Sequence, residues 1–280
     1  MKELHRILDS FESEASSGGN ARGSRRSPAF SALFGPPMSE LPQLYCALAG
    51  SFAQKYPEDR SVILHLDPDR ILTKSADELS ARLSEALHMA RTAERALVIV
   101  PDISEFCPKR SPSPENAPSQ LSVLAAVHIM TLIAEAQRAN SNIRILATTI
   151  RPWDVDPGVW RCTNPIFIGH LSAEEIADYF ANSSACDCFG YTQEECRQQI
   201  ARIAALCAEK RCLAYDIGRI SHDLNHKSII KTLTAYPDGN PELTHVLTLS
   251  EDEIDEVIAS ANGGDFYDEY YQRYLDFAAR

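Results

Sequence analysis

Five cysteines in the C-terminal half of the chain are the first residues whose chemistry deserves a test. They are Cys186, Cys188, Cys196, Cys207 and Cys212. A structural zinc site needs four ligands that converge tetrahedrally, and these usually come in Cys-x-x-Cys pairs. The spacings here are irregular, and Cys196 and Cys207 fall at core positions of one expected helix. We therefore predict free thiols and no metal site.

Two histidines form a second candidate. His222 and His226 are four residues apart, a spacing that places both imidazoles on one face of a helix. The metalloprotease pattern His-Glu-x-x-His needs a glutamate directly after the first histidine, and none stands there. We expect a polar or capping pair. Since the sequence also has no Gly-x-Ser-x-Gly or Cys-His-Asp arrangement, no catalytic residue is assigned.

A Gly-Pro-Pro turn between an apolar segment and a helical one has the placement of a phosphate-binding loop. The segment reads Leu33-Phe34-Gly35-Pro36-Pro37-Met38-Ser39-Glu40-Leu41-Pro42. It resembles the Walker A loop of AAA ATPases, L-x-G-P-P-G-T-G-K-[ST]. In such a loop glycines let N–H groups wrap the phosphates, lysine neutralises their charge and a hydroxyl holds Mg²⁺. A chance Gly-Pro-Pro turn is the alternative for this segment taken alone.

The resemblance shows which parts of the nucleotide site have been lost. Met38 and Glu40 stand at the glycines, Leu41 at the lysine and Pro42 at the hydroxyl residue. Glu40 adds negative charge where phosphates would lie. Only the Gly-Pro-Pro turn of the loop is kept, so the resemblance implies a loop that no longer cradles a triphosphate.

Two further segments follow in the order that this family has. Ala96–Cys107 resembles the Walker B strand, with Pro101 at the Mg²⁺-positioning acid and Asp102 at the acid that polarises water. Ile145–Asp156 resembles the sensor 1 segment A-T-N-x-P-W-x-[LI]-D of the katanin, spastin and fidgetin clade, with Ile150 at the asparagine. Without a Mg²⁺ anchor, we interpret Asp102 as a solvated or capping acid after a strand.

The remaining matches extend the resemblance to roughly residues 29–280. Arg161 stands in the arginine-finger run, so it is either a finger given in trans to an active partner or an ordinary surface arginine in an ion pair. Lys74 and Ser75 replace the pore-loop aromatic and glycine. Ala214 replaces the glycine that packs on adenine, and the acidic, aromatic tail from Asp265 resembles the C-terminal helix of the clade.

Apolar periodicity predicts the elements that must position these segments. Strands are expected at 30–34, 61–66, 96–100, 143–149 and 165–169, alternating with helices at 41–56, 76–92 and 120–139. Such an order calls for a parallel sheet between helices. Helices alone are expected at about 173–184, 192–209, 214–233, 250–261 and 264–279, with Ser172 and Glu175 as a capping box.

The predicted organisation has three parts. Residues 1–28 are a short amphipathic helix and a Gly/Ser/Arg-rich tail, 29–171 an AAA-like α/β domain of the P-loop NTPase type, and 172–280 a small helical lid. The N-terminal helix would carry Leu4, Ile7, Leu8 and Phe11 on one stripe. It is either a docking element or a frayed terminus.

Composition restricts the partners. The formal net charge of -12 over 280 residues is poorly matched to a phosphate backbone, which argues against nucleic acid. No apolar run approaches the roughly 20 residues of a membrane span. The cysteine usage and the N-terminal acids favour a cytoplasmic or nuclear location. We therefore expect a pseudo-ATPase without cofactor that binds proteins, with active AAA subunits in a hetero-oligomer as one candidate partner. A divergent ATPase that still binds ATP and Mg²⁺, and a monomeric adaptor, are the alternatives.

Overall fold

A computed structural model gives the structure of most of the chain. It describes residues 29–56, 61–72, 75–110, 118–138, 141–183, 189, 192–237, 247–261 and 268–279. The predictions for residues 1–28, Lys74, Cys186, Cys188 and 265–267 lie outside the described residues.

The described strands form one parallel sheet, as predicted. They are β1 (Phe30–Phe34), β2 (Ser61–His65), β3 (Arg95–Val100), β4 (Ile143–Thr149) and β5 (Asn164–Phe167). The sheet order is β2-β3-β4-β1-β5, and every pairing is parallel. β1 and β4 are buried along their whole length and β3 along nearly all of it, which is why each reads as an apolar run rather than an alternation.

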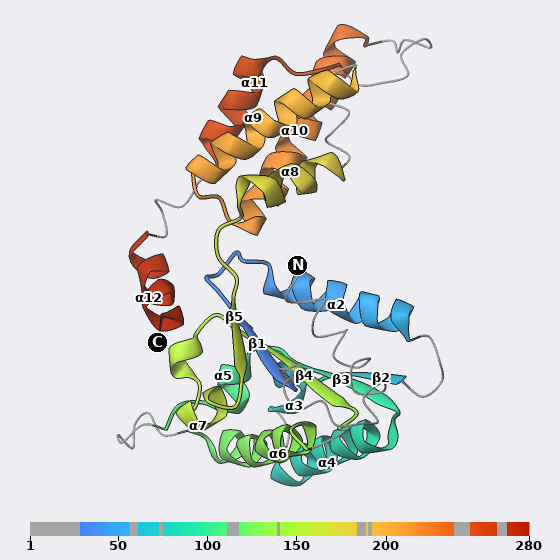
Figure 1. Ribbon diagram of the computed structural model, residues 1–280, viewed down its shortest axis with the longest axis vertical. Coiled ribbons are helices and arrows are strands. Elements are labelled where there is room, and N and C mark those ends of the chain that lie inside the picture. The colour runs from blue at the N-terminus through green and yellow to red at the C-terminus, as the bar shows by residue number, and fades with distance from the viewer. Residues whose placement is uncertain are drawn as a thin grey trace, which may run out of the picture. The chain divides into compact units, whose positions relative to one another are not determined.

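Helices cover both faces of this sheet (Figure 1). On one face lies α2 (Leu41–Lys55), which buries Leu41, Leu48 and Phe52. On the other lie α4 (Ala76–Thr92) and α6 (Gln120–Ala136), with α3 (Pro68–Ile71) beside them. α6 ends at Ala136 instead of the predicted 139. The α/β class and the parallel sheet are therefore confirmed.

Besides α3, three short helical segments follow strand ends where the sequence predicted none. They are α5 (Ile103–Phe106), the 3-10 turn η2 (Pro152–Asp154) and α7 (Pro157–Trp160). Each spans one turn or less, so it is too short to show a helical period in sequence. α7 begins because Asp156 accepts hydrogen bonds from the N–H groups of Gly158 at 2.7 Å and Val159 at 3.4 Å.

Helices alone follow β5. They are α8 (Ala173–Ala181), α9 (Gln193–Glu209), α10 (Ala214–Ala235), α11 (Glu251–Ser260) and α12 (Asp268–Ala278). The predicted capping box of Ser172 and Glu175 is present at α8. α8 to α11 bury a core of their own, to which Ile176, Phe180, Ile203, Ile220 and Ile254 contribute.

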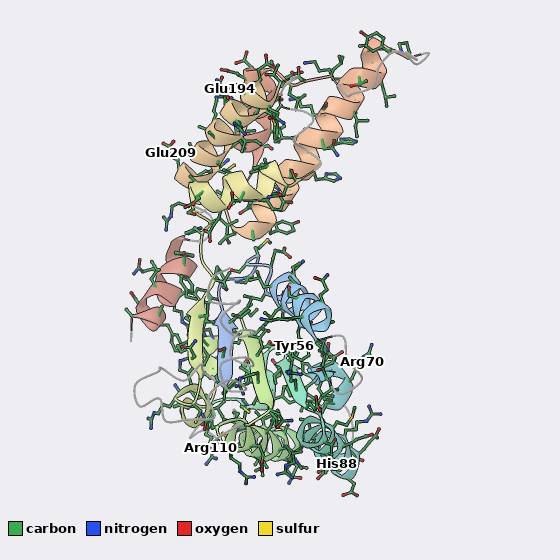
Figure 2. The ribbon with its side chains drawn as sticks, turned by 45° about the vertical axis from the view of Figure 1, so that its right-hand side comes forward. Tyr56, Arg70, His88, Arg110, Glu194 and Glu209 are labelled. Atoms are coloured by element: carbon green, nitrogen blue, oxygen red, sulfur yellow. The ribbon has the colours of Figure 1, made fainter. Side chains whose placement is uncertain are left out.

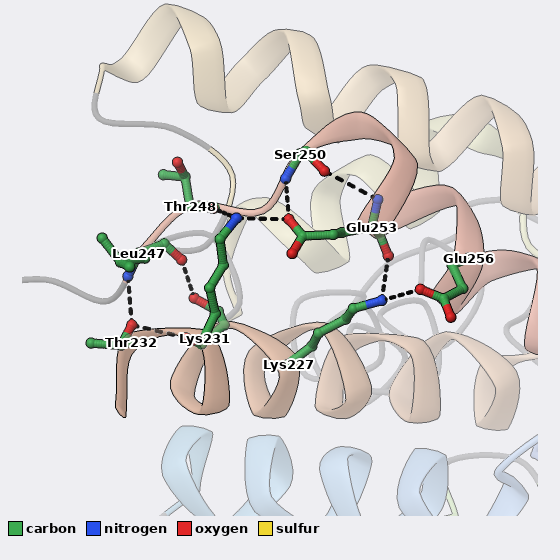
Figure 3. Close-up of polar contacts among 9 residues, drawn as sticks. Lys227, Lys231, Thr232, Leu247, Thr248, Ser250, Glu253 and Glu256 are labelled. Atoms are coloured by element: carbon green, nitrogen blue, oxygen red, sulfur yellow. Dashed lines mark hydrogen bonds and ion pairs between the residues drawn. The ribbon is translucent and has the colours of Figure 1, made fainter. Parts of the chain in front are cut away.

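A polar network joins α10 to α11 (Figure 3). Lys231 donates to Glu253 Oε2 at 2.7 Å and to the Thr248 carbonyl at 2.9 Å. Glu253 Oε2 also accepts from the Ser250 N–H at 2.7 Å, which closes a capping box at the start of α11. The Lys231 and Ser250 bonds hold the pKa of Glu253 down at about 2.

The chain divides into two compact units. Among the described residues, the first holds 29–35, Leu41–Ile168 and 276–279, and the second holds Pro36–Glu40 and Gly169–Leu275. The loop after β1 thus belongs to the helical unit although the strand and the helix on either side of it do not. No helix in the described ranges has both the length and the apolarity to cross a membrane.

Candidate functional site

The loop Pro36–Glu40 has a backbone conformation that its side chains disfavour. Met38 has φ 77° and Glu40 has φ 54°, both in the left-handed region. These are the two positions at which the Walker A resemblance expects glycine, the residue that adopts positive φ without steric cost. The Ser39 N–H donates to the Pro36 carbonyl at 3.1 Å and closes a turn. The loop therefore follows a path suited to glycine while carrying larger residues.

The second unit supplies a contact to this loop from α10. The Tyr215 N–H donates to the Met38 carbonyl at 3.2 Å, in the first turn of α10, which begins at Ala214. The buried Asp216 accepts from the Leu213 N–H at 3.1 Å. The N–H groups of Leu213 and Tyr215 at the start of α10 therefore donate to protein oxygens. In other proteins such N–H groups at a helix N-terminus can bind an anion.

The residue at the lysine position is buried. Leu41 is 4% exposed and belongs to an apolar cluster with Leu33, Leu97 and Leu146, between α2 and the sheet. Pro42 follows it in the first turn of α2, is exposed, and offers neither an N–H group nor a hydroxyl. These two residues cannot neutralise a phosphate or hold Mg²⁺.

The edge of the sheet where β3 and β4 end carries a cluster of polar side chains. Asp102 Oδ1 accepts hydrogen bonds from Ser104 Oγ and, at 3.3 Å, from Thr149 Oγ1. The Asp102 N–H donates to Thr148 Oγ1 at 3.3 Å. Arg151 approaches Asp102 Oδ2 at 4.0 Å and pairs with Glu105 at 2.5 Å. The cluster joins the ends of two neighbouring strands.

Asp102 was expected to be a solvated or capping acid, and its side chain is 33% exposed. Asp102 occupies the residue before α5, with φ 43°, but its side chain makes no capping hydrogen bond. Its carboxylate is instead partly surrounded by hydroxyl donors. Pro101 precedes it and provides no second carboxylate for a metal ion. Ile150, which follows β4 and is 38% exposed, provides no amide to orient a water molecule.

Sequence reasoning named Asp102 but missed the residues that bind it. Ser104, Thr148, Thr149 and Arg151 all lie within a few residues of a strand end. Polar residues just after neighbouring parallel strands meet at one edge of a sheet, and this signal was available in the sequence.

Arg161 lies outside this cluster, at the end of α7. The preceding Trp160 packs its ring against Phe34 and Phe277, with centroid distances of 5.5 and 5.2 Å. Arg161 itself is exposed, and its guanidinium forms no ion pair or hydrogen bond with any described residue. The ordinary ion pair expected for a surface arginine is therefore not found in the described part of the chain.

The cysteine cluster and the histidine pair are the two remaining candidate sites. Cys196, Cys207 and Cys212 are buried, and no group of three or more metal-ligating side chains occurs among the residues that the structure describes. A hydrogen bond with Cys212, and then burial, raise the pKa of the Cys207 thiol. His222 and His226 stack on the exposed face of α10, with ring centroids 6.1 Å apart.

Comparisons with known proteins add no assignment: no family model matches the chain, and a search of curated proteins finds no match.

Proposed function

We propose that this chain is a non-catalytic, AAA-like protein of the P-loop type that acts by binding other proteins as a subunit or scaffold of a larger complex. The observation that carries the proposal is the burial of Leu41. A P-loop needs a lysine at this position whose ammonium group reaches the β- and γ-phosphates. Here an apolar side chain points into the core instead.

The sheet order supports the AAA-like part of the proposal. β4 lies between β3 and β1, so the segments that follow these three strands leave from one edge of the sheet. A nucleotide site of this kind needs a phosphate loop, a metal-binding acid and a water-sensing residue at such an edge. The three segments follow these strands, and Pro101 and Ile150 stand where the resemblance expects the groups that would do the chemistry.

The net charge and the loss of the catalytic groups favour protein partners. The acidic charge disfavours nucleic acid, and a fold kept without its catalytic groups must act through its surfaces. An active AAA subunit in a hetero-oligomer is one such partner. It is favoured because Arg161 has no ion pair with any described residue, and a finger in trans must be free to reach a neighbour. A monomeric adaptor has no such need. Light scattering on the complex formed with a partner distinguishes the two by mass.

One observation favours an alternative, a divergent ATPase that remodels protein complexes. Met38 and Glu40 retain positive φ, so the backbone path of a phosphate loop persists. Release of phosphate from ATP by the purified full chain tests the choice. We expect no release above the rate without protein. Release that Asp102→Asn abolishes would support the ATPase and contradict the non-catalytic proposal.

A further inference from the structure

The helix α6 is apolar on two sides. Ala125, Ile129, Leu132 and Ile133 are buried against the sheet. Three other side chains, at spacings of four and three residues, face solvent: Val123 is 53% exposed, Val127 is 59% exposed and Met130 is 38% exposed. A surface helix normally carries polar residues on its outer face. An exposed apolar stripe of this kind marks an interaction site.

A groove runs along this stripe. It has a volume of about 680 Å³, and its walls include Val123, Val127, Met130, Pro118 and Val159. The spacing of the three exposed residues along the helix matches an i, i+4, i+7 surface, which receives the apolar face of a second helix.

The charged residues that line the groove form two ion pairs. Arg110 lies 3.7 Å from Asp156, and Arg138 lies 2.7 Å from Glu135. Both arginine side chains are exposed, at 89% and 69%. Figure 2 shows Arg110 at the end of the first unit where α6 and α7 lie. The charges that line the groove therefore balance, so the apolar stripe, and not the charge of the rim, selects the occupant.

We propose that the groove is the docking site of the chain's own residues 4–11. Leu4, Ile7, Leu8 and Phe11 have the i, i+3, i+4, i+7 spacing that a helix-binding groove needs. Residues 1–14 contain four acids, Glu3, Asp9, Glu12 and Glu14, against Lys2 and Arg6. This segment lies outside the described residues, and its pairing with the groove is independent of the proposed function.

The start of the described chain makes the pairing geometrically possible. The Ala29 carbonyl accepts from the Ile145 N–H at 2.9 Å, and Ala29 packs on the same core cluster as α6. Residues 12–28 are the 17 residues between Phe11 and Ala29, and a Gly- and Ser-rich linker of this length has a root-mean-square reach of about 23 Å. The 17 residues of α6 are about 25 Å long. A tether of this length gives an effective concentration on the order of 1 mM, which favours docking within one chain.

Photo-crosslinking in the full chain tests the proposal. Val127→p-benzoylphenylalanine places a crosslinker in the groove, and Met89→p-benzoylphenylalanine on α4 is the control position. Irradiation from Val127, but not from Met89, should join the groove to residues 4–11 at the mass of a monomer. Leu8→Asp should lower the yield about tenfold or more, since it places an unpaired carboxylate among apolar groups.

Ser13→Asp is the matched variant, because residue 13 lies opposite Leu8 on a helical wheel and adds the same charge. It should leave the yield unchanged, and circular dichroism should show the same helix content in all variants. Three results would overturn the proposal. They are crosslinks to the chain between Arg110 and Pro118, crosslinks at the mass of a dimer, and no crosslink from Val127.

Discussion

The backbone carbonyl of Met38 accepts a hydrogen bond of 3.2 Å from the N–H of Tyr215. This bond fixes the loop after β1 at a residue whose φ of 77° is unfavourable for methionine. The donor is an N–H group in the first turn of α10, a position at which N–H groups can bind anions. The loop is thus held by the protein itself, so its structure does not depend on a nucleotide.

Glycine at the strained positions should stabilise the protein. Met38→Gly removes a steric cost of about 1–2 kcal/mol and adds about 0.5–1 kcal/mol of unfolded-chain entropy, so the free energy of unfolding should rise by up to about 1 kcal/mol. Glu40→Gly should act in the same direction. Urea unfolding measures both. Ala49→Gly within α2 is the control and should lower the free energy by about 1 kcal/mol. A loss of stability in Met38→Gly would show that its side chain makes a compensating contact.

Asp102 should tolerate an amide but not a methyl group. Asp102→Asn keeps an oxygen that accepts from Ser104 and Thr149, and asparagine tolerates positive φ. We expect unfolding free energy to change by less than about 1 kcal/mol, with partner binding intact. Asp102→Ala loses both acceptors and should cost about 1–3 kcal/mol. Thermal and chemical unfolding measure these values. A clear functional loss in Asp102→Asn without a loss of stability would indicate a catalytic carboxylate.

Substitutions of Arg161 distinguish a structural role of its side chain from a role as an arginine finger in trans. Its guanidinium forms no ion pair or hydrogen bond with a described residue, so Arg161→Ala should change the unfolding free energy by less than about 0.5 kcal/mol. If the side chain serves the site of an active AAA subunit, the variant should lower the ATPase rate of the mixed complex while the complex stays assembled. Arg161→Lys should restore the rate only weakly, since lysine lacks the planar fork. An unchanged rate in both variants would exclude the finger.

The α10–α11 network predicts how stability depends on pH. The folded pKa of Glu253 is about 2, below the ordinary 4.5, because of the Lys231 and Ser250 bonds. The unfolded state therefore binds more protons between these values. The contribution of Glu253 is complete above about pH 4.5 and is lost as the pH falls towards 2.

Glu253→Gln should remove this acid dependence and lower stability at pH 7 by about 0.5–1 kcal/mol, after screening by solvent. Chemical unfolding at pH 6 and pH 3 gives the comparison. Glu251→Gln is the control, since Glu251 is exposed on the same helix and makes no side-chain hydrogen bond with a described residue. An equal loss of acid dependence in both variants would contradict the assignment to Glu253.

Most of the element order was predictable because local patterns determine it. The apolar runs of β1, β3 and β4 define strands, and the capping residue Ser172 defines a helix start, without tertiary information. The strand order depends on long-range pairing such as Phe34 with Thr149, which no local pattern contains. The parallel-sheet class was therefore predictable, but its order was not.

The conformation of the candidate loop was only partly predictable. Aligning the loop with a phosphate-binding motif identified Met38, Glu40 and Leu41, but not that the first two keep positive φ or that the third is buried. Those properties depend on the whole backbone and on packing against Leu97 and Leu146. Of the two hydroxyl donors to Asp102, Ser104 lies two residues further along the chain, whereas Thr149 comes from the neighbouring strand β4 and escapes a motif read along the chain.

Nucleotide binding tests the central claim most directly. Fluorescently labelled ATP is titrated with the purified full chain in the presence of Mg²⁺, and protein concentration is raised to the highest soluble value, with unlabelled ATP at millimolar concentration as competitor. We predict no saturable, competable binding, because Leu41 is buried and Pro101 and Pro42 supply no metal ligand. Saturable binding in the micromolar range would contradict the non-catalytic proposal and show that the loop from Met38 to Pro42 still holds a triphosphate.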